Sequence, residues 1–169
     1  MLNSSQGKLS HMAMQLEPTL ADRDSWKAER CSIDKAISTI GTRSAILLLR
    51  EAYYGTTRFD DFARRVGVTE AVAAARLKEL TELGALTKQP YREPGRRTRY
   101  EYVLTDMGRD LLPVVLALMQ WGDKYLQDDD GPLEVVEART GSPVRVRVQN
   151  AEGEDVELDG IRLGVRRAE

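Results

Sequence analysis

Four arginines lie within eight residues of a chain whose net charge is only −2. They surround a Pro-Gly pair in the stretch PYREPGRRTRYEY at residues 90–102, and they are Arg92, Arg96, Arg97 and Arg99. A guanidinium group binds phosphate through two parallel hydrogen bonds and suits the narrow, electronegative minor groove of DNA. The cluster therefore indicates a surface for a nucleic-acid backbone. The alternative is a solvated hairpin whose arginines serve solubility, although solubility does not require such clustering.

Other residues that usually carry chemistry are scarce. The single histidine, His11, lies within residues 1–12, which resemble an expression leader ending at a second candidate start, Met12. Without His11, histidine acid–base catalysis, Ser-His nucleophiles and His-ligated metal sites are all excluded. The sequence also contains no paired acid motif and no Gly-rich phosphate loop. We therefore expect no enzyme, no metal site and no cofactor.

Cysteine usage and hydropathy bound the compartment. Cys31 is the only cysteine, which excludes an intramolecular disulfide and fits a reducing compartment. No apolar run approaches the ~18 residues of a membrane span, and the pattern of a secretory signal is absent. We expect a cytoplasmic protein with no membrane partner. Cys31 itself is either an inert, buried small hydrophobe or a reactive thiol, because thiols near helix N-termini and basic side chains are the reactive ones.

Charge divides the chain into two parts. Residues 1–127 hold 19 basic and 16 acidic side chains, net +3, and residues 128–169 hold 6 basic and 11 acidic ones, net −5, which together give −2. The DDDGP run at 128–132 is typical of a linker. We predict a leader at 1–12, a main domain at 13–127 and a small β-rich extension at 128–169. Alternating apolar residues predict about four strands in that extension.

Helices precede the arginine hairpin. Apolar periodicity predicts helices over about 33–40, 43–54, 58–66 and 70–83. Their predicted caps are Ser32, Thr42, Thr57 and Thr69. The last two helices are joined by only three residues, 67–69, which is a helix-turn-helix pattern.

The hairpin itself follows the second helix of that pattern. After Gly84 the apolar period changes from 3.6 to 2, which predicts strands at 85–88 and 100–104 joined through 92–98. A hairpin in this place is a wing, and its tip carries the arginines. The predicted fold class is α+β, mostly α: a winged helix-turn-helix domain with a C-terminal dimerisation helix and a small appended β-unit.

A long helix, capped by Thr105 and running to about residue 125, is predicted after the wing. Pro113 predicts a kink near residue 109 or a late restart. The apolar surface of this helix is wider than one core-facing side requires, which favours contact with a second subunit over packing on its own core alone. The predicted dimerisation residues are Leu112, Val115, Leu118, Met119 and Trp121.

A series of short motifs spans most of the chain: CSID at 31–34, IG at 40–41, LLRE at 48–51, RFDDF at 58–62, RLKEL at 76–80, GAL at 84–86, YEYVLTDMG at 100–108, LLP at 111–113 and WG at 121–122. In this order they resemble the HxlR-type winged helix-turn-helix regulators of bacteria. The resemblance implies a homodimeric transcription factor that binds double-stranded DNA. It also implies that a cysteine at the position of Cys31 senses oxidants or electrophiles in some members, although the effector of this chain is unknown.

The resemblance makes 70–83 the recognition helix. The residues it assigns to DNA are Thr69, Glu70, Ala71, Ala74, Ala75, Arg76 and Lys78. Alanine forms no hydrogen bond with a base edge, so this helix should read few bases directly, although its methyl group can contact a thymine methyl. Arg76 either contacts phosphate or pairs with a carboxylate of the fold.

The predicted function is a sequence-specific repressor that binds a pseudo-palindromic operator, with half-sites about one helical turn apart. The alternative is a winged-helix module that holds another protein. That module would not need four arginines in its wing, and its binding would depend less on salt.

Overall fold

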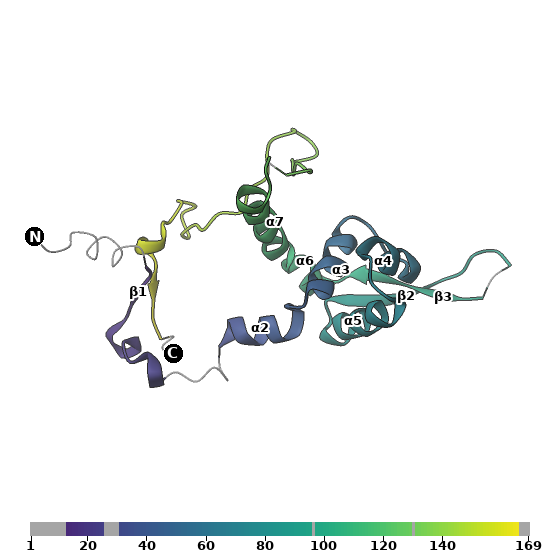
Figure 1. The fold of residues 1–169 in the computed structure, drawn as a ribbon, viewed down its shortest axis with the longest axis horizontal. Helices are drawn as coiled ribbons and strands as arrows, with labels where there is room; N and C mark the ends of the chain where they lie inside the picture. The colour runs from purple at the N-terminus through teal and green to yellow at the C-terminus, as the bar shows by residue number, and fades with distance from the viewer. Residues whose placement is uncertain (1–12, 26–30, 96, 130, 166–169) are drawn as a thin grey trace, which may run out of the picture. The chain divides into compact units, whose positions relative to one another are not determined.

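The computed structural model describes residues 13–25, 31–95, 97–129 and 131–165. The chain forms two compact units, drawn in Figure 1. The larger unit is Glu29–Val146, which extends past the predicted domain limit at residue 127. The smaller unit combines residues up to Ala28 with residues from Arg147 onward. The predicted leader at 1–12 and Arg96 lie outside the described residues.

Four helices open the larger unit: α2 (Ser32–Ile40), α3 (Arg43–Tyr53), α4 (Phe59–Val66) and α5 (Glu70–Leu83). Two of the predicted caps are confirmed. Thr42 Oγ1 accepts a hydrogen bond from the Ala45 N–H, and Thr69 Oγ1 accepts one from the Val72 N–H. Each cap satisfies one of the N–H groups that a helix leaves unpaired at its start.

The other two predicted caps are wrong. Helix α2 begins one residue earlier than predicted, because the Cys31 carbonyl already accepts the Lys35 N–H, so Cys31 is the N-cap and Ser32 lies inside the helix. Helix α4 is preceded by Arg58 rather than Thr57. Thr57 is held elsewhere, since its carbonyl accepts the Tyr102 N–H at 2.8 Å.

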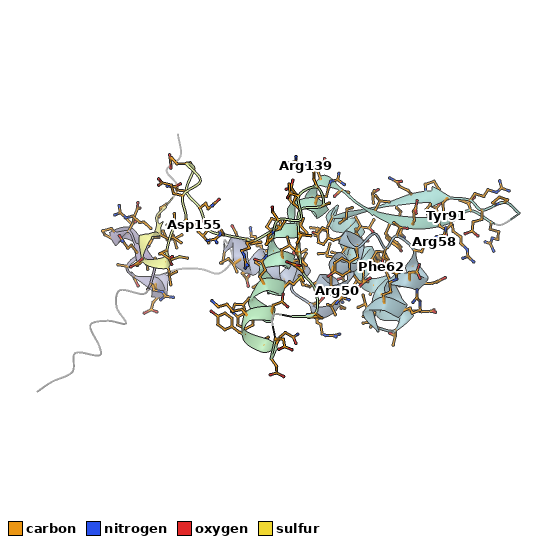
Figure 2. All side chains as sticks on the ribbon, turned by 90° about the horizontal axis from the view of Figure 1, so that it is seen from above. Arg50, Arg58, Phe62, Tyr91, Arg139 and Asp155 are labelled. Carbon is orange, nitrogen blue, oxygen red and sulfur yellow. The ribbon has the colours of Figure 1, made fainter. Side chains whose placement is uncertain are left out.

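Helices α3, α4 and α5 pack around one hydrophobic core. Its largest fully buried side chains are Phe62, Leu48, Leu49, Leu77, Leu80 and Leu86. Burial of each such side chain contributes about 1.5–3 kcal/mol. Phe62, labelled in Figure 2, meets Tyr102 edge to face with ring centroids 6.2 Å apart, which ties the helices to the hairpin.

The hairpin consists of β2 (Leu86–Tyr91) and β3 (Arg99–Leu104), paired antiparallel from Leu86↔Leu104 to Tyr91↔Arg99. The ribbon projects from the helices on the side away from α7 (Figure 1). Strand β2 runs three residues beyond its predicted end at Lys88 and includes Pro90. A two-stranded ribbon tolerates this proline because every strand in it is an edge strand.

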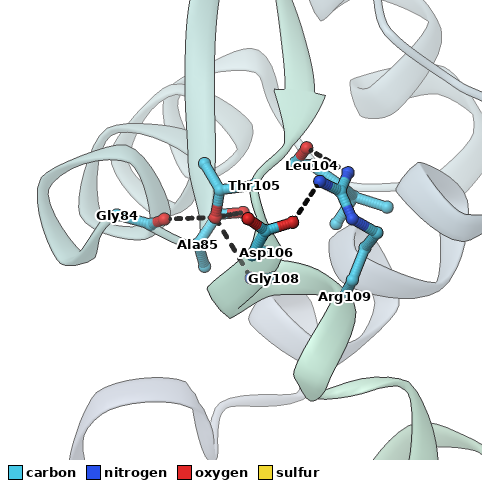
Figure 3. A network of polar contacts seen from close by, with 7 residues as sticks. All are labelled: Gly84, Ala85, Leu104, Thr105, Asp106, Gly108 and Arg109. Atoms are coloured by element: carbon cyan, nitrogen blue, oxygen red, sulfur yellow. Dashed lines mark hydrogen bonds and ion pairs between the residues drawn. The ribbon is translucent and has the colours of Figure 1, made fainter.

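The predicted C-terminal helix is interrupted, as Pro113 indicated. Helix α6 (Asp106–Asp110) ends at Leu111, and α7 (Leu112–Leu126) restarts there with Pro113 in its first turn. Thr105 caps α6 by accepting the Gly108 N–H, which confirms the prediction. Thr105 Oγ1 also lies 2.5 Å from the Gly84 carbonyl oxygen, so the end of α5 and the start of α6 share one hydroxyl (Figure 3).

The tail differs from the prediction of about four strands. Within its described part the one strand is β4 (Arg162–Leu163), which pairs in parallel with β1 (Gln15–Leu16) in the smaller unit. Isolated bridges at Val136↔Pro143 and Gln149↔Asp155 stand where other strands were expected. In the 144–146 segment the Gln120 side-chain amide binds the Val144 carbonyl and the Val146 N–H, and the Val144 N–H donates to the Val135 carbonyl.

Three short 3-10 helices complete the smaller unit: η1 (Pro18–Leu20), η2 (Arg23–Ser25) and η4 (Leu158–Gly160). No helix in the described ranges is long and apolar enough to cross a membrane.

Candidate nucleic-acid interface

Helices α4 and α5 form the predicted helix-turn-helix. Gly67 ends α4 with a φ of +69°, a left-handed conformation that favours glycine. Thr69 then begins α5, whose buried side is Ala73, Leu77 and Leu80. The opposite side of α5 is therefore free to meet a ligand.

The exposed side of α5 carries methyl groups at positions that were predicted to face the bases. Ala71, Ala74 and Ala75 are all exposed, as is the neighbouring Val72. Thr69 and Glu70 at the start of the helix are exposed as well. None of the three alanines offers a donor or an acceptor to a base edge.

The two basic residues of α5 pair with carboxylates of their own helix. Arg76 forms an i,i+3 ion pair with Glu79. Of the two roles left open for Arg76, the structure therefore shows the pairing with a carboxylate of the fold. Lys78 Nζ lies 3.6 Å from the Glu82 carboxylate. With Glu70, the helix holds three acidic and two basic residues, net −1. It therefore supplies no net positive charge.

The positive charge lies on the wing. Residues 86–104 hold five basic and two acidic side chains, net +3. Arg92, Arg97 and Arg99 are exposed, and the last ladder pair, Tyr91↔Arg99, leaves residues 92–98 as the turn. The structure thus brings the described wing arginines together at the far end of the hairpin.

A cleft of about 480 Å³ lies where the last ladder pairs of the wing meet the start of α4, and it is lined by Arg58, Phe59, Asp60, Asp61, Tyr91, Arg99 and Tyr100. A hydrogen bond from Arg64 lowers the pKa of the Asp61 carboxyl, so Asp61 is ionised at neutral pH.

The sequence analysis missed Arg58 as a residue of this site, because its neighbours Glu93 and Tyr91 come from a distant part of the chain.

Helix α7 has no buried residue. Of the five predicted dimerisation residues, Leu112, Leu118 and Trp121 are exposed, whereas Val115 and Met119 are half-buried. Trp121 is 55% exposed and stacks at a tilt against Tyr125.

Sequence reasoning missed a second apolar face, on α2. Ile33 is 70% exposed and Ile37 is 61% exposed, one helical turn apart, while Ile40 in the next turn is buried. The signal was present in the i, i+4, i+7 spacing of these isoleucines, which is the spacing of a contact face. Nearby Cys31 is exposed at the start of the same helix, which does not fit the buried alternative left open for this thiol.

No group of three or more potential metal-ligating side chains occurs in the described part of the chain.

Comparisons with known proteins agree with this geometry. The family model of the HxlR-like helix-turn-helix matches residues 39–130, more than half of the chain. An uncharacterised HTH-type transcriptional regulator of Mycobacterium tuberculosis, MT3179, is 42% identical over 101 residues, which are 60% of this chain and 63% of that protein. The chain thus spans less than two thirds of this relative's length. The name of this relative is that of a transcriptional regulator, the class of protein expected from the sequence.

Two solved structures are informative. PA1607, described as a candidate transcription factor, superposes with a TM-score of 0.71 at 32% identity, covering 80% of this chain and 94% of PA1607. The redox regulator HypR in its reduced form gives a TM-score of 0.51 at 27% identity, covering 56% of this chain and 93% of HypR. The first of these confirms the predicted fold class. With its helix-turn-helix, its wing and the family match over residues 39–130, the chain belongs to the HxlR-like helix-turn-helix family.

Proposed function

We propose that this chain is a homodimeric transcriptional repressor that binds double-stranded DNA and acts by steric occlusion. The observation that carries the proposal is the concentration of exposed arginines on a wing beside a helix-turn-helix. The names of the relatives, which are HTH-type transcriptional regulators, support it.

The wing and α5 divide the work in this proposal. Arg92, Arg96, Arg97 and Arg99 supply most of the affinity by binding phosphates. Arg76 and Lys78 contribute less, because each is paired with a glutamate of α5. Specificity comes from contacts of the α5 methyl groups with thymine methyls and from the shape of the DNA.

A homodimer fits the exposed apolar faces. The side chains of α7 and the Ile33–Ile37 face of α2 lie in the same unit and leave a large apolar surface uncovered. A second copy of the chain would bury these faces through a two-fold axis. The operator would then be a pseudo-palindrome with half-sites about one helical turn apart.

Cys31 is the candidate sensor of the proposed regulator. It is exposed at the N-terminus of α2, so oxidants and aldehydes in solution reach it. HypR, which the chain resembles in fold, is a redox regulator. If the Cys31→Ser variant keeps DNA binding that is equally sensitive to peroxide and aldehydes, the sensor role is refuted.

The decisive experiment is fluorescence anisotropy with promoter DNA from upstream of the protein's own gene and with a randomised duplex pool, titrated with salt. The Arg96→Ala/Arg97→Ala variant tests the wing. The matched control is Arg139→Ala/Arg145→Ala, which removes the same charge from the exposed 131–146 segment.

Tight wild-type binding should weaken steeply with salt, by about 0.9 in log–log slope for each phosphate contact. The wing variant should show a shallower slope, whereas the control should keep the wild-type slope. If the wild type binds neither DNA above the non-specific level, the regulator proposal fails and a protein partner for the winged helix becomes the better explanation.

A further inference from the structure

Arg58 joins the helix-turn-helix to the wing through its backbone. It immediately precedes α4, and its extended backbone forms an antiparallel bridge with Glu101 of β3. The adjacent Thr57 carbonyl accepts the Tyr102 N–H at 2.8 Å. Residues 57–58 therefore act as a short third strand along β3.

The Arg58 side chain reaches the other strand. Its Nη1 donates a hydrogen bond to Glu93 Oε1 at 2.8 Å, and its guanidinium carbon lies 4.5 Å from the centroid of the Tyr91 ring. Figure 2 shows Arg58 and Tyr91 side by side along the hairpin, and Tyr91 belongs to its last ladder pair. The bond to Glu93 and the proximity of Tyr91 raise the pKa of Arg58. One residue thus contacts β3, the end of β2 and the start of the turn.

The wing needs such a support. A two-stranded ribbon is marginally stable by itself and twists more than a larger sheet does. Residues 92–98 extend past the last ladder pair, Tyr91↔Arg99. The direction of the arginines relative to α5 therefore depends on the contacts that hold the ribbon beside α4, which Arg58 makes at the last ladder pair and at the start of the turn.

Arg58 is poorly suited to bind a phosphate itself. Its guanidinium is already bound to the Glu93 carboxylate. Asp60 and Asp61 line the same cleft, and their negative charges repel an incoming phosphate.

We propose that Arg58 is a positioning residue that fixes the angle of the wing relative to α4 and α5, so that the wing arginines reach the DNA phosphates. The inference rests on the DNA-binding function proposed above. The Arg58–Glu93–Tyr91 contact acts on affinity through the arginines that it orients.

The test measures the salt dependence of DNA binding for Arg58→Lys, by anisotropy with the duplex that the wild type binds. Lysine keeps the positive charge but loses the planar fork and the stacking on Tyr91. We expect affinity to fall about tenfold. The loss of one phosphate contact per subunit, two per dimer, should also reduce the log–log salt slope by about 1.8. A merely structural role would lower the active fraction and leave this slope unchanged.

The Glu93→Gln variant weakens the same Arg58–Glu93 ion pair by changing the residue on the wing. It provides a second test if Arg58→Lys folds poorly. If Arg58 orients the wing, Glu93→Gln weakens binding, and the double variant is no weaker than the weaker single one. The matched control is Arg64→Lys, an exposed arginine of α4 that pairs with Asp61 of its own helix, and it should keep the wild-type slope.

Two results would overturn the inference: a wild-type slope in Arg58→Lys, or tighter binding by Glu93→Gln, which is the result expected if Arg58 were a phosphate contact held back by Glu93. Failure of the underlying function is distinguishable, because in that case the wild type itself shows no salt-dependent binding.

Discussion

Replacement of Gly108 by alanine tests the junction between the winged helix and α7. Gly108 is buried in α6, and a Cβ atom added to it would lie 2.1 Å from the Ala85 carbonyl oxygen. That oxygen belongs to backbone that joins α5 to β2. The junction therefore has no room for the smallest side chain, and the clash is with main chain that cannot rotate away.

The magnitude follows from the distance. A carbon–oxygen contact needs about 3.3 Å, so the backbone must separate by about 1.2 Å. Overpacking of this kind costs about 1–3 kcal/mol. The Ala85 carbonyl also accepts the Thr105 N–H, at 3.2 Å, and loss of such a hydrogen bond adds about 1 kcal/mol. Alanine regains about 0.5–1 kcal/mol of helix propensity, which leaves a net destabilisation of about 1–3.5 kcal/mol.

The assay is urea unfolding at a fixed protein concentration, with Gly122→Ala as the control. Gly122 lies in α7, and its added Cβ would meet no atom within 4 Å. This control should be unchanged or stabilised by up to about 1 kcal/mol. If Gly108→Ala proves as stable as Gly122→Ala, the inference that the junction has no room for a side chain at residue 108 is refuted.

Three further outcomes are expected. The Tyr53 hydroxyl donates a hydrogen bond to the Gly108 carbonyl, and burial raises the pKa of Tyr53. The contribution of this hydroxyl to the free energy of unfolding is therefore complete below about pH 10 and is lost as pH rises through the folded-state pKa. Tyr53→Phe should cost about 1 kcal/mol at pH 7, with a deficit that shrinks in urea unfolding above pH 10; a constant deficit would contradict this. Leu118→Glu should shift sedimentation from dimer to monomer, and a variant that stays dimeric would refute the α7 interface. A duplex with uracil in place of thymine should bind the wild type more weakly, and this loss should be smaller for the Ala75→Gly variant. If the wild type binds the thymine and uracil duplexes with equal affinity, contacts with thymine methyl groups are excluded.

The features predicted correctly from the sequence are those determined locally. Thr42 and Thr69 each bond to an N–H of their own helix, so residue type and position sufficed. The restart of α7 follows from Pro113, which has no N–H to donate. The turn of the wing was marked by Pro-Gly and basic residues alone.

The features that were missed depend on distant segments. Thr57 does not cap α4, because its carbonyl is occupied by Tyr102 of β3. The role of Arg58 could not be predicted for the same reason, since its partners Tyr91 and Glu93 follow two helices later. In the tail, alternation did not identify the partners of the chain, which for Val144 and Val146 include the side chain of Gln120 in α7.

The location of the arginines in a chain of net charge −2 has a physical reason. Helical geometry brings residues three and four apart together, so Arg76 and Lys78 are each neutralised by the next glutamate on their face of α5. The ribbon of residues 86–104 holds five basic residues and only two acidic ones, so its net charge is +3. A phosphate backbone is therefore attracted to the wing and not to α5. Under the proposed function, affinity and sequence preference are then carried by different elements, and we expect a change in the angle between the wing and α5 to alter affinity before it alters the bases that are preferred.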